Sequence, residues 1–357
     1  MSAREILVRG PNWTGDLIMA TPGFRALRAG FPDARITLLV REPLCPLLDG
    51  APWFDRVVPL APGRSGLLRL LREGRALRRS KRFELGLCLP DSFEAALLMR
   101  LAGVRHSVGY ARGGRSALLH EAVPLPAASA RVLLARELHV LGLVEALGCP
   151  PRGTALELFV TEAEEREAEA RLLERGVDPA AKLVLLAPGA SFGASKLWPA
   201  ESFAAVGDAL SEQGASLVVV GGPGERALAA RVAAAMRGPV ADLTGAIGLG
   251  PLKALVRRAR LLVANDAGAR HLAVAFGVPC VVLMGPTSLE KTNLNLERVS
   301  VLSADVACRP CYLRDCPIDH RCLTRIPPAL VAAEGARALA AGSHFAGVQR
   351  VVGGLAA

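Results

Sequence analysis

The chain has 357 residues, of which 51% are hydrophobic and 21% charged, and its formal net charge is +10. This length allows two domains with separate cores, and this composition excludes a disordered chain. No apolar run approaches the roughly 20 residues that cross a bilayer, and the chain begins with a short strand pattern instead of a signal-peptide core. We therefore expect a cytoplasmic protein whose eight cysteines are reduced thiols or metal ligands.

The positive charge is concentrated in the first half of the chain. Residues 1–160 hold 22 Lys and Arg against 14 Asp and Glu, whereas residues 161–357 hold 21 against 19. The densest part runs from Arg64 to Arg82 and predicts a basic amphipathic helix. Such a helix is either a solvated surface helix or a contact for an anionic membrane or an acidic acceptor. No aromatic residue interleaves with these arginines, which disfavours single-stranded nucleic acid as a partner.

Short apolar runs alternate with helix-length segments along the whole chain. This rhythm predicts an α/β protein with two βαβ sets and therefore two parallel sheets. The predicted strands are Glu5–Arg9, Arg35–Val40, Arg56–Leu60 and Leu85–Leu89 in the first half, and Leu183–Ala187, Ser216–Val220, Leu261–Ala264 and Cys280–Met284 in the second.

A linker pattern separates the two sets. A loop rich in Gly and Pro at 148–153 precedes an acidic helix, which we expect from Thr161 to Arg175. Thr161 and Glu164 have the spacing of a capping box. We place one domain at residues 1–160 and the other at residues 161–357.

The turn after the first strand carries Asp16. We expect this carboxylate on the first turn of a helix, at the carboxyl end of a parallel sheet, where ligands bind. There it could accept a proton from an acceptor hydroxyl. The alternative is a helix N-terminal aspartate that interacts only with the helix dipole.

Two turns in the second half suit a nucleotide. Lys196 is one of only five lysines and follows a strand and a loop of small residues, where an ammonium group can meet phosphate oxygens. The turn at Gly221, Gly222 and Gly224 allows close backbone approach, and Glu225 adds a carboxylate for ribose hydroxyls. The alternative for Lys196 is an ordinary surface lysine. The alternative for the glycine turn is a loop unrelated to nucleotide binding, because its glycine motif is incomplete.

The stretch from Leu261 to Pro279 is the most informative in the chain. Its apolar run ends in Asn265 and Asp266, and a helix pattern begins near Gly268 and His271. The unpaired N–H groups of a first helical turn bind anions such as a diphosphate. The alternative is an ordinary turn with Asp266 as the N-cap.

Four cysteines lie within 15 residues, at positions Cys308, Cys311, Cys316 and Cys322. Four thiols match a closed tetrahedral zinc site, but only the first pair has C-x-x-C spacing. Structural zinc, reduced unligated thiols and a redox or iron–sulfur role all stay open here.

Taken together, these motifs resemble the ADP-heptose:lipopolysaccharide heptosyltransferases of glycosyltransferase family 9, most closely the heptosyltransferase II group. The resemblance spans nearly the whole chain. It rests on the Gly-x-x-Trp-x-Gly-Asp motif ending at Asp16, the segment 89–97, Pro188-Gly-Ala-Ser with Lys196-x-Trp-Pro, Asn265-Asp-x-Gly-x-x-His, and Gly285-Pro-Thr.

The resemblance implies a GT-B fold, with two Rossmann-like domains facing each other across a cleft. It also implies inverting transfer of heptose from ADP-heptose to the lipopolysaccharide inner core by direct displacement, with Asp16 as general base. No cofactor is required. The implied donor residues are Ser191, Lys196, Glu225, Thr244, Gly245, Asp266, Gly268 and His271, and the implied acceptor residues are Ser92, Arg112 and Arg115.

The expected partners are therefore the nucleotide sugar, the lipopolysaccharide core acceptor and the anionic cytoplasmic face of the inner membrane. The chain departs from the family where Ala267 replaces a usual Ser or Thr and Arg270 replaces an apolar residue. Arg270 could compensate by pairing with phosphate or with acidic groups of the acceptor, or it could signal a different donor. The alternatives are a nucleotide-sugar epimerase or hydrolase on a similar fold and a non-catalytic glycolipid-binding protein.

Overall fold

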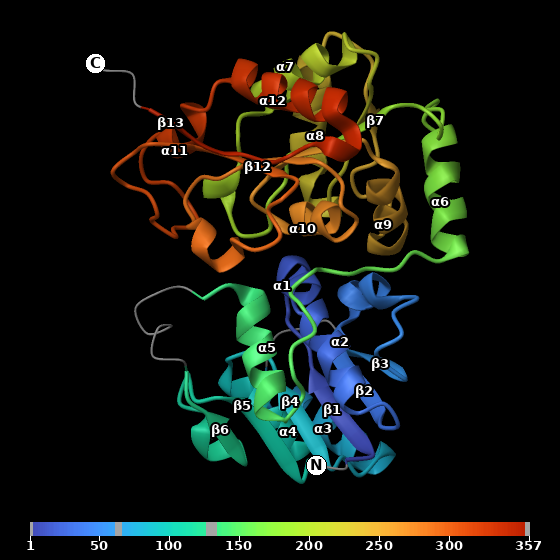
Figure 1. Cartoon of the computed structure of the whole chain (residues 1–357), viewed down its shortest axis with the longest axis vertical. Coiled ribbons are helices and arrows are strands. Elements are labelled where there is room, and N and C mark those ends of the chain that lie inside the picture. Colours follow the sequence, from blue (N-terminus) through green and yellow to red (C-terminus); the bar gives the residue numbers. More distant parts are fainter. Residues whose placement is uncertain (1–2, 61–65, 126–133, 354–357) are drawn as a thin grey trace. The chain divides into compact units, whose positions relative to one another are not determined.

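The computed structural model describes residues 3–60, 66–125 and 134–353, which form two α/β units (Figure 1). The first unit comprises Met1–Glu157 together with Glu290–Leu294, and the second comprises Leu158–Leu289 and Asn295–Ala357. The contact boundary thus falls close to the one placed at residue 160 from the sequence. The return of five residues to the first unit has no signal in the sequence.

The first unit contains a six-stranded sheet in the order β3-β2-β1-β4-β5-β6, and every neighbouring pair is parallel. Its strands are β1 (Glu5–Arg9), β2 (Arg35–Arg41), β3 (Arg56–Leu60), β4 (Leu85–Cys88), β5 (His106–Tyr110) and β6 (Glu121–Val123). Its helices are α1 (Thr14–Met19), α2 (Thr21–Gly30), α3 (Leu67–Ser80), α4 (Phe93–Leu101) and α5 (Arg136–Ala146).

Burial explains why the central strands read as continuous apolar runs. Ile6, Leu7 and Val8 of β1 have no exposed surface, because β1 lies between β2 and β4 and both faces of the sheet are covered. In register, Ile6 pairs with Ile36 of β2 and with Leu85 of β4. The carboxyl ends of β1 and β4 therefore lie side by side.

The second unit contains a seven-stranded parallel sheet in the order β13-β12-β11-β10-β7-β8-β9. Its strands are β7 (Leu183–Ala187), β8 (Ser216–Val219), β9 (Ala241–Asp242), β10 (Leu261–Asn265), β11 (Cys280–Leu283), β12 (Val299–Ala304) and β13 (Gln349–Val352). Its helices are α6 (Glu162–Leu173), α7 (Ala200–Ser211), α8 (Arg226–Ala235), α9 (Leu249–Arg258), α10 (Gly268–Ala275), α11 (Arg321–Thr324) and α12 (Pro328–Ala341).

The acidic helix α6 begins as the sequence predicts. The hydroxyl of Thr161 accepts from the backbone N–H of Glu164, and the Glu164 carboxylate accepts from the N–H of Thr161 at 2.8 Å. The helix then packs against α9, beside which it runs in Figure 1. Glu164 forms a buried ion pair of 3.0 Å with Lys253, which fixes α6 to the second unit.

The prediction of two parallel sheets is confirmed, and all eight predicted strands form within one residue of the expected ends. The sequence pattern did not predict five further strands, namely β5, β6, β9, β12 and β13. Three of them have two to four residues, and β5 and β12 carry Ser, His or Gly among their apolar residues. Such strands form because a neighbouring strand offers hydrogen bonds, which local periodicity does not report.

Candidate functional site

Each sheet reverses its winding direction at one place. In the first unit the chain leaves β1 toward β2 and leaves β4 toward β5, so the reversal lies between β1 and β4. In the second unit β7 leads to β8 and β10 leads to β11, so the reversal lies between β7 and β10. Ligands of open α/β sheets bind beyond the strand carboxyl ends at such points. The predicted residues Asp16, Lys196 and Asp266 all follow one of these four strands.

In the second unit, three side chains converge on Asp266. Lys196 Nζ lies 2.7 Å from its Oδ2 and 2.8 Å from its backbone oxygen. Thr287 Oγ1 donates to the same Oδ2 at 2.7 Å, and Arg270 NH1 donates to Oδ1 at 3.0 Å. All three donors bond inside the protein, so the Asp266 carboxylate holds Lys196 and Arg270 in place.

Charge decides the protonation of this cluster. Burial alone would raise the pKa of Asp266, but Arg270 and Lys196 outweigh burial and hold that pKa well below its usual range. Burial, followed by the charge of Arg270, lowers the pKa of the neighbouring His271 to about 3. The site therefore combines an ionised Asp266, two cations and a neutral His271, and it has a positive balance suited to a diphosphate.

Asp266 is not the N-cap of α10. The helix begins at Gly268 with Ala267 as the N-cap, and no side chain accepts a hydrogen bond from its first turn. The Asp266 carboxylate is instead used by the cations. The alternative prediction of Asp266 as an N-cap is therefore wrong. The backbone N–H groups in the first turn of α10 have no side-chain cap.

Buried hydrogen bonds position Lys196. Asn265 has no exposed surface, and its side chain donates to Pro188 O at 2.6 Å and accepts from Trp198 N at 3.3 Å. Ser195, next to Lys196, donates through Oγ to Leu313 O at 2.5 Å and through its backbone N to Arg314 O at 2.9 Å. The 194–196 turn is thus held from the end of β10 and from the loop after β12.

Glu225 lies beside the ends of β7 and β8. Its Oε2 accepts from Gly222 N at 2.8 Å. A side chain at Gly189 would collide with this carboxylate, and one at Gly221 would meet it as well. These glycines make room for Glu225, which explains the glycine-rich turns found in the sequence.

Thr244 and Gly245 adjoin the same place. Gly245 N bonds to Gly221 O at 2.9 Å, and the φ of Gly245 is +66°, a conformation that favours glycine. The Thr244 side chain is buried, and its hydroxyl has no hydrogen-bond partner among the described residues. A buried hydroxyl without a partner suits a polar ligand atom. Ser191, by contrast, is exposed in the turn after Gly189.

In the first unit, Asp16 lies on the first turn of α1, as predicted. The Asp16 side chain is 27% exposed, and its Oδ1 is 3.4 Å from Arg136 Nε. No other ion pair of Asp16 is found in the part of the chain that the structure describes. This carboxylate is oriented by one cation and stays accessible.

A second carboxylate, Asp91, lies just beyond β4 and was not among the predicted residues. It pairs with Arg115 at 3.1 Å, His139 at 3.5 Å and Arg112 at 3.7 Å. Burial would raise the pKa of Asp91, but His139 and Arg115 outweigh it and lower that pKa. The signal was available, because the quoted 89–97 segment follows a predicted strand of the same sheet as Asp16.

The three predicted acceptor residues differ in accessibility. Arg112 is exposed, whereas Arg115 has no exposed surface and bonds to Tyr110 O, Pro90 O and Asp91. Ser92 is the N-cap of α4 and accepts from Ala95 N at 3.2 Å. Arg112 is thus free to meet a ligand directly, while Arg115 and Ser92 shape the turn around Asp91.

The predicted basic helix is present as α3, although Arg64 lies outside the described residues. Leu70 and Leu77 are buried in the core of the first unit. Leu67 and Leu68 are exposed, and so are four arginines: Arg72, Arg75, Arg78 and Arg79. The apolar stripe therefore serves the core, and the outer face is basic with two leucines at one end.

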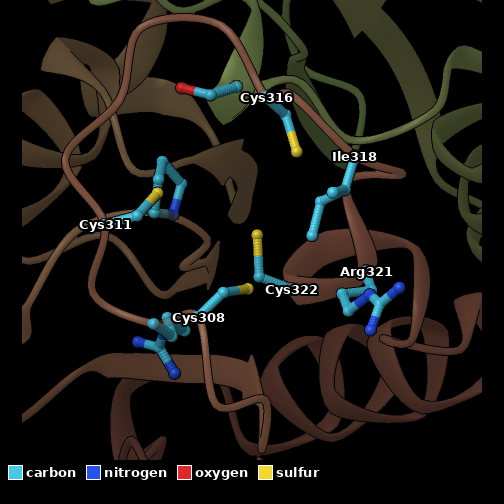
Figure 2. Close-up of a pocket in the computed structure, with 9 residues that line it drawn as sticks. Cys308, Cys311, Cys316, Ile318, Arg321 and Cys322 are labelled. Carbon is cyan, nitrogen blue, oxygen red and sulfur yellow. The ribbon is translucent and has the colours of Figure 1, made fainter.

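The four clustered cysteines belong to the second unit and line one small pocket (Figure 2). Burial and the neighbouring thiols of Cys308 and Cys316 raise the pKa of Cys322 to about 11. Within the described ranges, no three or more His, Cys, Asp or Glu side chains are already placed to hold a metal ion. Nor does any helix there have the length and apolarity to cross a membrane.

Comparison with known proteins places these features in context. Residues 70–321 match the family described as "Glycosyltransferase family 9 (heptosyltransferase)". The chain is 28% identical over 299 residues to lipopolysaccharide heptosyltransferase 2 of Salmonella typhimurium, which covers 81% of this chain and 84% of that protein.

Two solved structures are similar over most of their length. Escherichia coli ADP-heptose lps heptosyltransferase II superposes with a TM-score of 0.79 at 25% identity, covering 94% of this chain and 98% of that one. The glycosyl transferase family 9 protein of Veillonella parvula superposes with a TM-score of 0.75 at 23% identity, covering 84% and 85%.

Proposed function

Because the chain belongs to glycosyltransferase family 9, the heptosyltransferases, we propose that it moves heptose from ADP-heptose to the inner core of lipopolysaccharide, with inversion at the anomeric carbon. The chain has the GT-B fold of its structural relatives. The observation that carries the proposal is the family match over residues 70–321, which includes Lys196, Asp266 and their partners.

The donor binds to the second unit in this proposal. ADP-heptose is named for the similar Escherichia coli enzyme. Lys196, Arg270 and the uncapped start of α10 supply positive charge for a diphosphate, with His271 beside them. Glu225 accepts from ribose hydroxyls, and the unpartnered Thr244 hydroxyl meets the nucleoside. Asp266 acts by positioning the cations.

The acceptor reacts at the first unit. Asp16 accepts the proton of the acceptor hydroxyl as its oxygen bonds to the anomeric carbon. The bond between that carbon and the β-phosphate oxygen breaks, and ADP leaves with the electron pair. Lys196 and Arg270 stabilise the negative charge that builds up on the leaving group. The reaction thus requires no metal ion for charge compensation.

We place the lipid-linked acceptor at the basic face of the first unit. Arg112 is the accessible cation near Asp91, and the exposed arginines of α3 add further positive charge. Core lipopolysaccharide carries phosphates and acidic sugars in an anionic leaflet. The enzyme accordingly works as a peripheral protein at the cytoplasmic face of the inner membrane.

The direct test is transfer by the purified protein. Incubation with ADP-heptose and a truncated inner-core acceptor should add one heptose to the acceptor, detected by mass spectrometry, and release one ADP. Nuclear magnetic resonance of the product should show the inverted anomeric configuration. If ADP-heptose is converted or hydrolysed without acceptor, the protein is an epimerase or hydrolase, and if neither substrate changes, it only binds.

The donor assignment has its own test. Lys196→Ala removes one charged hydrogen-bond donor, so ADP affinity measured by calorimetry should fall about 10- to 100-fold, as expected for about 1.5–3 kcal/mol. Lys182→Ala is the matched control, because Lys182 is exposed and donates to the backbone oxygen of Gln213. Unchanged ADP affinity in the Lys196 variant would remove this lysine from the donor site.

A further inference from the structure

The cysteine-rich loop of the second unit has no core of its own. Residues 305–320 connect β12 to α11 without helix or strand, and every one of them is exposed or half-exposed. A segment of this kind gains little stability from apolar burial. Small structures without a core are commonly held by a metal ion or a disulfide. The four cysteines of the cluster are all free thiols.

The four sulfur atoms lie around one space. Figure 2 shows the side chains of Cys316 and Cys322 pointing toward each other, with Cys308 and Cys311 on the loop beside them. All four line the same pocket: Cys308, Cys311 and Cys316 come from the loop after β12, and Cys322 comes from helix α11. His320 N also bonds to Cys316 Sγ at 3.4 Å, as backbone amides do around thiolate ligands.

The chemistry of this pocket selects the ligand class. Its lining holds four thiols and no carboxylate or imidazole. Four thiolates suit Zn²⁺ or iron in tetrahedral geometry and do not suit Mg²⁺ or Ca²⁺. Cys308 and Cys311 are exposed on the loop, where small rotations can bring their sulfurs closer to the other two.

The same loop supports both turns that serve Asp266. Pro286 O accepts from Cys311 N at 3.0 Å and from Tyr312 N at 2.9 Å, beside Thr287. Arg309 Nε donates to Gly285 O at 2.7 Å. On the other side, Ser195 bonds to the backbone oxygens of Leu313 and Arg314, next to Lys196.

We propose that Cys308, Cys311, Cys316 and Cys322 bind one thiophilic metal ion, Zn²⁺ or Fe²⁺, and that this ion fixes the loop which holds Lys196 and Thr287 at Asp266. Each thiol that ligates the ion releases its proton to solvent. The metal site stands independently of the catalytic activity, whereas its effect on donor binding rests on the proposed function. The ion is structural and takes no part in transfer.

Elemental analysis tests the metal site directly. Protein purified without chelators from medium containing zinc and iron should carry about one equivalent of one of these metals, and the measured element decides between them. Reconstitution with Co²⁺ should give the visible absorption of tetrahedral cobalt together with thiolate-to-cobalt charge transfer. Cys322→Ser and Cys308→Ser should lose the metal, and Cys45→Ser, which changes a cysteine of the first unit, should retain it.

A structural role predicts that a chelator lowers the melting temperature of the wild type and that added metal restores it. This measurement keeps the proposal testable even if the cysteine variants fold poorly. Metal-free protein from zinc- and iron-rich medium, with all four thiols reactive toward a thiol reagent, would overturn the site.

Donor binding tests the second half of the proposal. Removal of the metal should weaken ADP binding several-fold by calorimetry, and restoring the metal should recover it. Stoichiometric metal with ADP affinity unchanged by chelation would refute the link to Lys196 while leaving the metal site intact. Loss of transfer activity alone would bear on the proposed function and not on the metal.

Discussion

Both units place a carboxylate in the segment that follows a strand at the reversal point of the sheet, but the two carboxylates have different surroundings. Asp16 in the first unit is accessible and has one cation, Arg136, at 3.4 Å. Asp266 in the second unit is buried and accepts from Lys196, Arg270 and Thr287 at 2.7 to 3.0 Å. The segments after two reversal-point strands thus carry one accessible carboxylate and one buried carboxylate held by three donors.

This difference in accessibility and hydrogen bonding indicates different roles for Asp16 and Asp266. The buried Asp266 carboxylate already accepts from three donors and its pKa is lowered, so it is a poor proton acceptor, and its negative charge would repel a phosphate at close range. Asp266 can therefore act only through the cations that it holds. Asp16 retains access to solvent and can take up a proton. Substitution of Asp16 should therefore lower turnover, whereas substitution of Asp266 should lower the free energy of unfolding.

The largest effect should come from Asp16→Asn. The amide cannot accept the proton of the acceptor hydroxyl, so turnover should fall about 10²- to 10⁴-fold. ADP affinity and melting temperature should stay near the wild-type values, because Asp16 has only one ion pair. Steady-state transfer rates and calorimetry measure the two quantities. Asp33→Asn, at an exposed site of the same unit, is the control and should retain full turnover.

If Asp16→Asn kept near-normal turnover, Asp16 would be excluded as the base. Asp91 would then be the remaining carboxylate beyond the central strands of that sheet, and Asp91→Asn would be the next variant to assay.

Asp266→Asn should act on stability. It leaves Lys196 and Arg270 buried without their counterion, which should cost about 3 kcal/mol in the free energy of unfolding at pH 7. Because the folded-state pKa of Asp266 is depressed, its contribution is complete above the unfolded-state pKa. The gap between wild type and variant should shrink as the pH falls below about 4. Denaturant unfolding across this range provides the measurement.

Glu201→Gln is the matched control for that series, since Glu201 forms an exposed ion pair with Arg231 in the same unit. It should change the unfolding free energy little. A gap for Asp266→Asn that widened toward low pH would contradict the assigned charge state.

His271 sharpens the comparison through a smaller, pH-dependent effect. Its folded-state pKa is lowered to about 3, so the unfolded chain takes up the proton first as the pH falls. Below about pH 6.5, His271 should reduce stability by about 1.4 kcal/mol per pH unit. His271→Gln should remove this component, seen as a flatter dependence of unfolding free energy between pH 6.5 and 5. Equal slopes in both proteins would mean that His271 is not kept neutral.

The most salt-dependent effect should come from the outer face of α3. Replacing Arg72, Arg75, Arg78 and Arg79 with Gln removes charges that each contribute about 1 kcal/mol near an anionic membrane. Co-sedimentation with anionic liposomes at low salt should be lost, and the KM for acceptor should rise several-fold. The KM for donor should not change, since the proposed donor site lies in the second unit. A rise in the donor KM alone would reverse the assignment of the two units.

Much of the fold was readable because buried parallel strands leave long apolar runs. The segments that follow these strands could be predicted as well, since Asp16 and Lys196 lie within ten residues of a strand end and Asp266 directly follows one. The hydrogen-bond partners of these side chains could not be predicted from the sequence. The hydrogen bonds to Asp266 from Thr287, in the loop after β11, and from Arg270 of α10 depend on contacts that only the folded chain brings together.

The role of Arg270 shows this limit most clearly. From the sequence it was a candidate partner for phosphate or for acidic groups of the acceptor. In the structure it is 1% exposed and bonds to Asp266, four residues earlier. The i, i+4 spacing of Asp266 and Arg270 is compatible with an ion pair. Because Asp266 precedes the helix, however, the sequence does not show whether the Arg270 side chain reaches it. The unpartnered Thr244 hydroxyl likewise has no sequence signature beyond a Thr before a glycine.

The room kept for Glu225 by Gly189 and Gly221 has a consequence for enzyme engineering. In the proposed donor site, positions 189 and 221 must stay glycine as long as residue 225 is Glu, because a methyl group at either one would push against its carboxylate. The adjustable positions are then 225 and 244, whose side chains end in the space beside those glycines. A small library at these two sites, screened against donors with different bases, offers the shortest route to a glycosyltransferase with altered donor choice.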